Sequence, residues 1–164
     1  MKLDLHEVIG VPGAHVSFDC EPELADLSVE SAYDVLPGAH ASGSVKNSAG
    51  ALTLSGVLEA DMRCTCARCL REFDKHISLS VAAALADSLQ DEDNPDIFLL
   101  EGDAADLDEV FRTAFIFEMP QRFLCSENCP GLCEKCGKNL NDGPCSCTAE
   151  PDPRLAVLRQ LLEK

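Results

Sequence analysis

The clearest pattern along the chain is a two-residue alternation of apolar and polar positions in its middle third. From Leu52 to Cys66 almost every second residue is apolar or small, with polar or charged residues between them. After a short break, the alternation resumes from Phe73 to Leu85. A period of two is typical of a strand with one buried face. Two such runs, joined by CARCLRE at residues 66–72, predict a long antiparallel hairpin.

Shorter and less regular strands are expected on both sides of this hairpin. Residues 10–50 are rich in Gly, Pro, Ala and Ser, so any strands there should be short. An acidic loop is expected at residues 87–96. The expected strands are residues 1–8, His15–Phe18, Ala32–Leu36 and an edge strand at Ile97–Leu100.

The period changes to that of a helix after Asp106. Acidic residues crowd the first turn, where the helix dipole favours negative charge, and Pro120 ends the helix. The apolar residues at helical spacing are Leu107, Val110, Phe111, Ala114 and either Phe117 or Glu118. Asp152 and Pro153 then predict the start of a last helix, as N-cap and first residue.

Together these elements predict an α+β fold. We expect a mainly antiparallel sheet with a long central hairpin, one or two helices packed on it, and a small cysteine-rich zinc-knuckle tail. The predicted segments are 1–122, a mixed antiparallel sheet domain with a helix near 106–118; 123–150, a metal-binding tail; and 151–164, a C-terminal helix.

Charge changes the picture of possible partners. The formal net charge is −16, whereas proteins that bind nucleic acid through its phosphates are normally basic. One route to RNA is a local contact through the sole basic spot, formed by Arg63, Arg68, Arg71 and Lys75. The other route is an acidic face, especially residues 87–109, that holds a basic partner protein. We favour the second route.

The tail contains six of the ten cysteines, within residues 125–147. Its other residues are mostly small or polar and bury no core of their own, and a metal could order it, because metal-binding energy becomes folding energy. Cys133 and Cys136 have C-x-x-C spacing followed by glycine, which suits zinc, and the two further ligands are to be chosen among four cysteines. Those four are Cys125, Cys129, Cys145 and Cys147. We expect one structural Zn²⁺ per chain, in preference to an iron–sulfur cluster or disulfides.

A second cysteine cluster lies at the predicted hairpin tip. Cys64 continues the apolar face of its strand and is expected to be a buried thiol, as is the isolated Cys20. Cys66 and Cys69 also have C-x-x-C spacing. They are either half of a metal site completed by the tail or simple turn and core residues, and we favour the second interpretation.

Location and reactivity follow from the remaining features. The N-terminal MKLDLHEVIG has two acids and no apolar core, so no signal peptide is expected, and no apolar run is long enough to span a membrane. A cytoplasmic location is therefore expected, with reduced thiols. A thiol redox protein or redox sensor is the alternative function. It is disfavoured because neither C-x-x-C pair lies between a strand and a helix.

The motifs resemble those of a known family. CARCL in a hairpin, a helix ending in proline, LCSENCPGLCEKCGKNLNDGPCSC and DPRLAVLRQLL together resemble the YceD-like family of large ribosomal RNA subunit accumulation proteins. The resemblance covers roughly residues 45–164. The residues that match family motifs are Cys66, Arg68, Cys69, Leu70 and the tail cysteines; Cys64 lies outside them.

The resemblance implies a role without known enzymatic activity. That role is the accumulation, processing or stability of 23S rRNA during large-subunit biogenesis. It implies a ribosomal large-subunit precursor or a basic ribosomal protein as partner and no small-molecule substrate. Some family members lack the tail cluster, which implies that the metal stabilises the tail and is not the shared activity.

Overall fold

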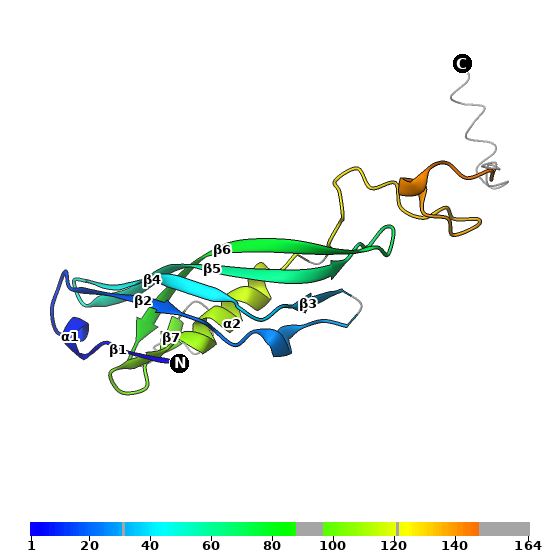
Figure 1. Ribbon diagram of the computed structural model, residues 1–164. Coiled ribbons are helices and arrows are strands. Elements are labelled where there is room, and N and C mark those ends of the chain that lie inside the picture. The colour runs from blue at the N-terminus through cyan, green and yellow to red at the C-terminus, as the bar shows by residue number, and fades with distance from the viewer. Residues whose placement is uncertain (31, 88–96, 121, 148–164) are drawn as a thin grey trace, which may run out of the picture.

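A six-stranded sheet forms the main body of the molecule, and one helix lies against one of its faces (Figure 1). The computed structural model describes residues 1–30, 32–87, 97–120 and 122–147. Along the sheet the strands are β2 (His15–Cys20), β4 (His40–Ser48), β5 (Ala51–Thr65), β6 (Glu72–Ala86) and β7 (Ile97–Leu99), with β3 (Tyr33–Val35) also paired to β5. The other elements are β1 (Lys2–Asp4), α1 (His6–Ile9), η1 (Ala25–Leu27), β8 (Ala104–Asp106), α2 (Leu107–Glu118) and η2 (Leu140–Asp142). The predicted α+β class is confirmed.

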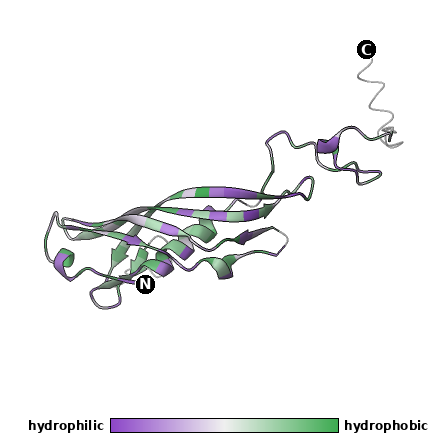
Figure 2. Ribbon diagram, viewed as in Figure 1, coloured by the Kyte–Doolittle hydropathy of each residue, from purple (hydrophilic) through white to green (hydrophobic). Residues whose placement is uncertain are grey.

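The predicted hairpin is the longest feature of the sheet. β5 and β6 pair without interruption from Leu52 opposite Leu85 to Thr65 opposite Glu72. The alternation that predicted them appears as changing colours along both strands in Figure 2. The apolar positions of β5 face α2 and form the centre of the core, because alternate residues of a strand lie on one side of the sheet.

A glycine pair lets an aromatic pair approach the sheet. Gly43 of β4 lies opposite Gly56 of β5, and the ring of Phe18 rests over both. Phe18 in turn meets Phe111 of α2 edge to face, with ring centroids 5.7 Å apart. Any side chain at either glycine would occupy the space of Phe18, so these residues fix how closely β2 and α2 pack on the sheet.

Helix α2 begins and ends where the sequence predicts. The Asp106 carboxylate accepts the backbone N–H of Asp108 at 3.0 Å as an N-cap, and Pro120 follows the last turn. Its buried residues are Leu107, Val110, Phe111 and Phe115. The predicted last position of the core stripe, Phe117 or Glu118, is wrong, since both side chains are exposed, that of Phe117 by 73%. Phe115, four residues after Phe111, takes the buried position.

The first 50 residues differ most from expectation. The predicted strand at 1–8 ends at Asp4, and α1 follows it. Strand β4 has no counterpart among the predicted elements, whereas β2, β3 and the edge strand β7 do. The predicted helix at 151–164 and most of the acidic loop at 87–96 lie outside the described residues. In the part of the chain that is described, no helix has the length and apolarity needed to cross a membrane.

Candidate metal centres

Eight of the ten cysteines gather into two groups of four. The first group contains Cys66, Cys69, Cys125 and Cys129; the second contains Cys133, Cys136, Cys145 and Cys147. Within each group the four sulfur atoms all lie within 4.8 Å of one another. All ten cysteines are in the described residues, and none forms a disulfide. Four thiols around one centre are the donor set of structural zinc and of some iron–sulfur clusters.

The first group joins the hairpin tip to the tail. Cys66 and Cys69 come from the turn between β5 and β6, and the other two come from the segment after α2. The sulfur of Cys66 lies 3.8 Å from that of Cys129, and the sulfur of Cys69 lies 3.6 Å from that of Cys125. A tetrahedron of thiolates at the zinc–sulfur bond length has edges of about 3.8 Å, so these two distances match the edges of a zinc site.

Backbone geometry at the tip points both thiols to one side. The N–H of Leu70 donates to the carbonyl oxygen of Cys66, and the N–H of Cys66 donates to that of Arg71, both at 2.9 Å. Leu70 has a φ of 57°, in the left-handed region that a non-glycine residue rarely adopts. The tip is therefore a closed turn in a sparsely populated conformation, which its contacts with the tail help to hold.

Contacts other than those of the thiols also attach the tail to the tip. The N–H of Ala67 donates to the carbonyl oxygen of Phe123 at 2.9 Å, and the guanidinium of Arg68 donates to that of Cys129 at 3.0 Å. Gly131, at a φ of +78°, lies so close that a Cβ there would be 3.0 Å from the carbonyl oxygen of Arg68. The cysteine pairs thus meet through a packed interface.

The second group is built within the tail and is more exposed. The Cys133–Gly137 turn closes through the N–H of Gly137, which donates to the carbonyl oxygen of Cys133 at 2.8 Å. The sulfur atoms of Cys133 and Cys145 are 3.3 Å apart. Cys136 is exposed and the other three are half-buried, whereas three of the four thiols in the first group are buried. Solvent therefore reaches the second group more easily.

The thiols of each group differ in acidity. Burial would raise the pKa of Cys66, but surrounding backbone N–H groups, that of Cys125 first, lower it to about 6. Burial raises the pKa of Cys125 to about 12. In the second group, backbone N–H donors lower the pKa of Cys133 to about 6, and the hydrogen bond with Cys136 raises that of Cys147 to about 12. Four neighbouring thiolates repel one another, so a bound cation is what allows all four to ionise.

The grouping differs from the single tail site that the sequence predicted. Cys133 and Cys136 do share a group, but with both Cys145 and Cys147, while Cys125 and Cys129 belong with the hairpin tip. The structure places Cys66 and Cys69 beside two tail cysteines, as the metal-site interpretation of this pair requires, and metal binding there stays a prediction. The signal in the sequence that could have indicated two groups is the occurrence of eight cysteines in four close pairs. Cys64 is buried outside both groups, as expected.

The four cations of the predicted basic spot lie in different surroundings. Arg63 pairs with Asp74 at 3.3 Å on the exposed face of the sheet, and Arg71 pairs with Asp142 in the tail at 2.7 Å. Arg68 binds backbone carbonyls of the tail, and the ammonium of Lys75 lies 5.3 Å from the ring centroid of Phe123. Each has an intramolecular contact, and their role in contacting RNA stays a prediction.

Asn141 supports the first group from η2. Its side-chain amide donates to the sulfur of Cys129 at 3.3 Å and lowers the pKa of that thiol. We expect Asn141→Ala to weaken metal binding at the first group by about tenfold, because donors to a ligand typically tune metal affinity by that order. Competition with a chromophoric chelator measures the change. Asp142→Ala, which removes only the exposed pair with Arg71, should leave the affinity unchanged.

Comparison with known proteins adds the family. Residues 54–162 match the family described as large ribosomal RNA subunit accumulation protein YceD. The chain belongs to this family. The matched part of this YceD family member contains the hairpin tip, α2 and all eight cysteines of the two groups. The family's description links it to the accumulation of the large ribosomal RNA subunit and names no catalytic activity.

Curated relatives of this YceD family member come from mycobacteria. An uncharacterized protein of Mycobacterium bovis and uncharacterized proteins of two Mycobacterium tuberculosis strains are each 29% identical over 113 residues. That alignment covers 66% of this chain and 55% of each relative, so the chain spans about half the length of the curated relatives it matches. No solved structure matches the chain.

Proposed function

We propose that the chain is a non-enzymatic ribosome-biogenesis factor of the cytoplasm. In this proposal it supports the synthesis, processing or stability of 23S rRNA by binding a basic ribosomal protein or an intermediate of large-subunit assembly. The match of residues 54–162 to the YceD family carries the proposal. The nature of the partner follows from charge, because a chain with a net charge of −16 attracts cations and repels phosphates.

The two cysteine groups supply structure in this proposal. Each would hold one Zn²⁺ through four thiolates, which fill a tetrahedral coordination shell and leave no position for a substrate. The first centre would lock the hairpin tip to the tail and the second would order the tail itself. A centre of four thiolates and one divalent ion carries about two negative charges, so both centres would make the protein more acidic.

The distribution of charged side chains supports a protein partner over direct RNA contact. On the exposed face of the sheet, Glu59 and Asp61 follow one another along β5, and Asp74 lies beside them on β6. Asp74 pairs with Arg63 at 3.3 Å and Asp61 lies 2.8 Å from the imidazole of His76, but both contacts are exposed to solvent and weak, so a cationic partner can compete for these carboxylates. This face therefore offers carboxylates that a cationic partner can reach.

Affinity capture with and without nuclease tests the proposal. With the tagged chain as bait, we expect basic large-subunit proteins to remain bound after nuclease treatment of the lysate. We expect them to be released as salt is raised, because salt screens attraction between exposed charges. If every ribosomal component disappears with the RNA, binding to a basic protein is wrong and the local RNA contact takes its place.

A further inference from the structure

Strand β6 is an open edge of the sheet along most of its length. On one side it pairs with β5 from Glu72 to Leu85, but on the other side β7 covers only Ala84–Ala86. Among the described residues, no strand pairs with residues 72–83 on that second side. Alternate backbone N–H and C=O groups of such a strand point outward without a partner strand, which makes the edge a template for another chain.

The open edge is protected in one half and unprotected in the other. The half near the hairpin tip carries Glu72, Asp74, Lys75 and His76, and charged side chains discourage unwanted pairing. The other half, Ser78–Ala83, reads SLSVAA and contains neither a charge nor a proline. The unprotected half is therefore the part able to accept an added strand.

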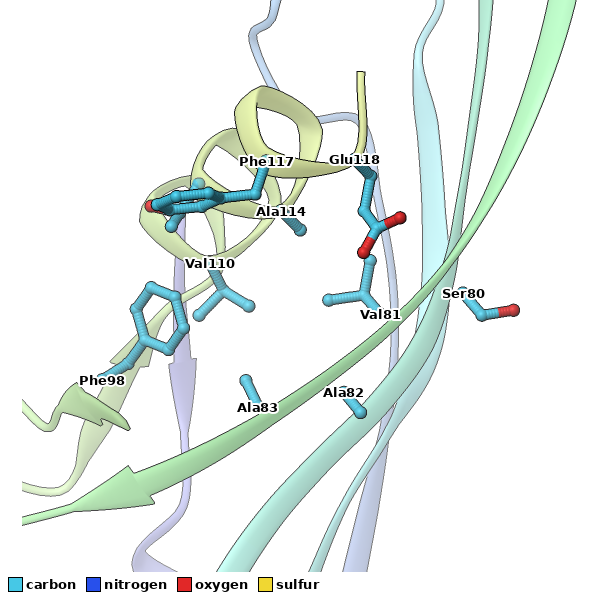
Figure 3. Close-up of a pocket in the computed structure, with 10 residues that line it drawn as sticks. Ser80, Val81, Ala82, Ala83, Phe98, Val110, Ala114, Phe117 and Glu118 are labelled. Carbon is cyan, nitrogen blue, oxygen red and sulfur yellow. The ribbon is translucent and has the colours of Figure 1, made fainter. Parts of the chain in front are cut away.

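An apolar groove adjoins that unprotected half. It has a volume of about 250 Å³ and lies between α2 and β6, next to β7. Figure 3 shows Val110, Ala114 and Phe117 of α2 on one side and Val81 and Ala83 of β6 on the other, with Phe98 of β7 near one end. The 73% exposure of Phe117 leaves an aromatic surface that the fold itself does not cover.

The charge at the groove is negative. Among the described residues that line it, Glu118 alone is charged. It lies at the C-terminal end of α2, where the helix dipole adds further negative potential. With a net charge of −16 on each chain, a second copy would bring like charges together, whereas a cationic segment would meet complementary charge.

We propose that Ser78–Ala83 and the adjoining groove bind an extended, cationic segment of a partner protein. The segment adds to the sheet as a strand beside β6, places one apolar side chain against Phe117 and Phe98, and sets its positive charges near Glu118. Strand addition of this kind takes affinity from backbone hydrogen bonds and specificity from the pocket for a side chain. The cationic nature of the partner rests on the proposed function; the docking site rests on the edge and the groove.

Two matched pairs of substitutions test the docking site. Phe117→Asp and Ile116→Asp both replace an exposed apolar residue of α2, but only Phe117 lines the groove. Ala82→Lys and Ala84→Lys both place a cation on the exposed face of β6, but β7 covers the edge only at Ala84. The probe is the RNA-free protein fraction of purified large ribosomal subunits, and bound proteins are quantified by mass spectrometry. Each variant is first checked for parental metal content and melting temperature.

We expect Phe117→Asp and Ala82→Lys to lower binding of basic ribosomal proteins by about tenfold, as loss of a buried anchor at an interface does. Ile116→Asp and Ala84→Lys should change this binding by less than about twofold, and Ala82→Glu should not weaken it.

If the parent binds these proteins but all variants bind them equally, the docking site is wrong and the proposed function stands. If the parent binds none of these proteins, the proposed function fails, and the docking proposal fails with it. Binding of purified rRNA and self-association are measured separately on the same variants. Stronger rRNA binding by Ala82→Lys overturns the proposal in favour of RNA, and self-association that is lost in both Ala82 variants overturns it in favour of a second copy.

Discussion

Replacement of Cys69 by serine is expected to lower the metal content from about two ions per chain to about one and to release the tail from the hairpin tip. Cys69 is one of the four cysteines of the first group, and its sulfur lies 3.6 Å from that of Cys125. Structural zinc contributes about 10–16 kcal/mol to the folding of small metal-ordered modules, so loss of one ligand should lower the affinity of this centre by more than about a hundredfold. The sheet should stay folded, because its core is formed by other residues.

Metal analysis and limited proteolysis measure this result. We expect about two zinc ions per parent chain, since two groups of four thiols are present. For the Cys69→Ser variant we expect about one, with faster cleavage between residues 122 and 133. The matched control is Cys64→Ser, a cysteine in the same hairpin that is 1% exposed and outside both groups. It should keep both metals while losing some core stability.

Other outcomes would contradict specific parts of this account. Equal loss of metal in both variants would mean that the first centre depends on general stability of the hairpin. A parent without metal, whose thiols react quickly before denaturation, would favour the thiol redox alternative. Global unfolding of the Cys69→Ser variant would make the tail part of the core and reject the predicted boundary between 1–122 and 123–150.

Gly43→Ala is expected to destabilise the sheet severely. A Cβ at this position would lie 2.3 Å from the carbonyl oxygen of Ser55 and 2.6 Å from the Cα of Gly56. Both are backbone atoms of the paired strand, so relief of the clash requires β4 and β5 to separate where Phe18 packs over them. We expect a loss of about 3 kcal/mol or more in the free energy of unfolding, at the upper end of overpacking effects.

Chemical denaturation of the metal-loaded protein measures this loss. Gly10→Ala is the control, because nothing lies within 4 Å of a Cβ there and its φ of −92° suits any residue. It should change the free energy of unfolding by less than about 0.5 kcal/mol. If Gly43→Ala costs no more than this, β4 and β5 do not pack as closely as the structure indicates.

The hairpin and α2 were predictable because local pattern and burial agree there. The alternation placed the hairpin connection at residues 66–72, and the strands end at Thr65 and begin at Glu72. Strand β4 gives no such pattern, because its sequence HASGSVKNS is mostly small and polar. One of its buried residues is Asn47, whose amide donates to the carbonyl oxygens of Val8 and Ile9 at 2.8 and 3.0 Å. A buried polar residue satisfied by distant partners is not visible in a hydrophobic pattern.

The cysteines show the same division between local and distant information. By itself, the sequence determined the hairpin, the capped helix and the presence of thiols that could hold a metal, because each depends on residues close together in the chain. Only the tertiary structure decided which thiols share a centre, since the partners Cys69 and Cys125 are brought together by the docking of the tail on the hairpin tip. It also decided that Phe117 faces solvent beside an open strand edge. Contacts between distant segments depend on how the whole core packs, and residue spacing alone does not encode that.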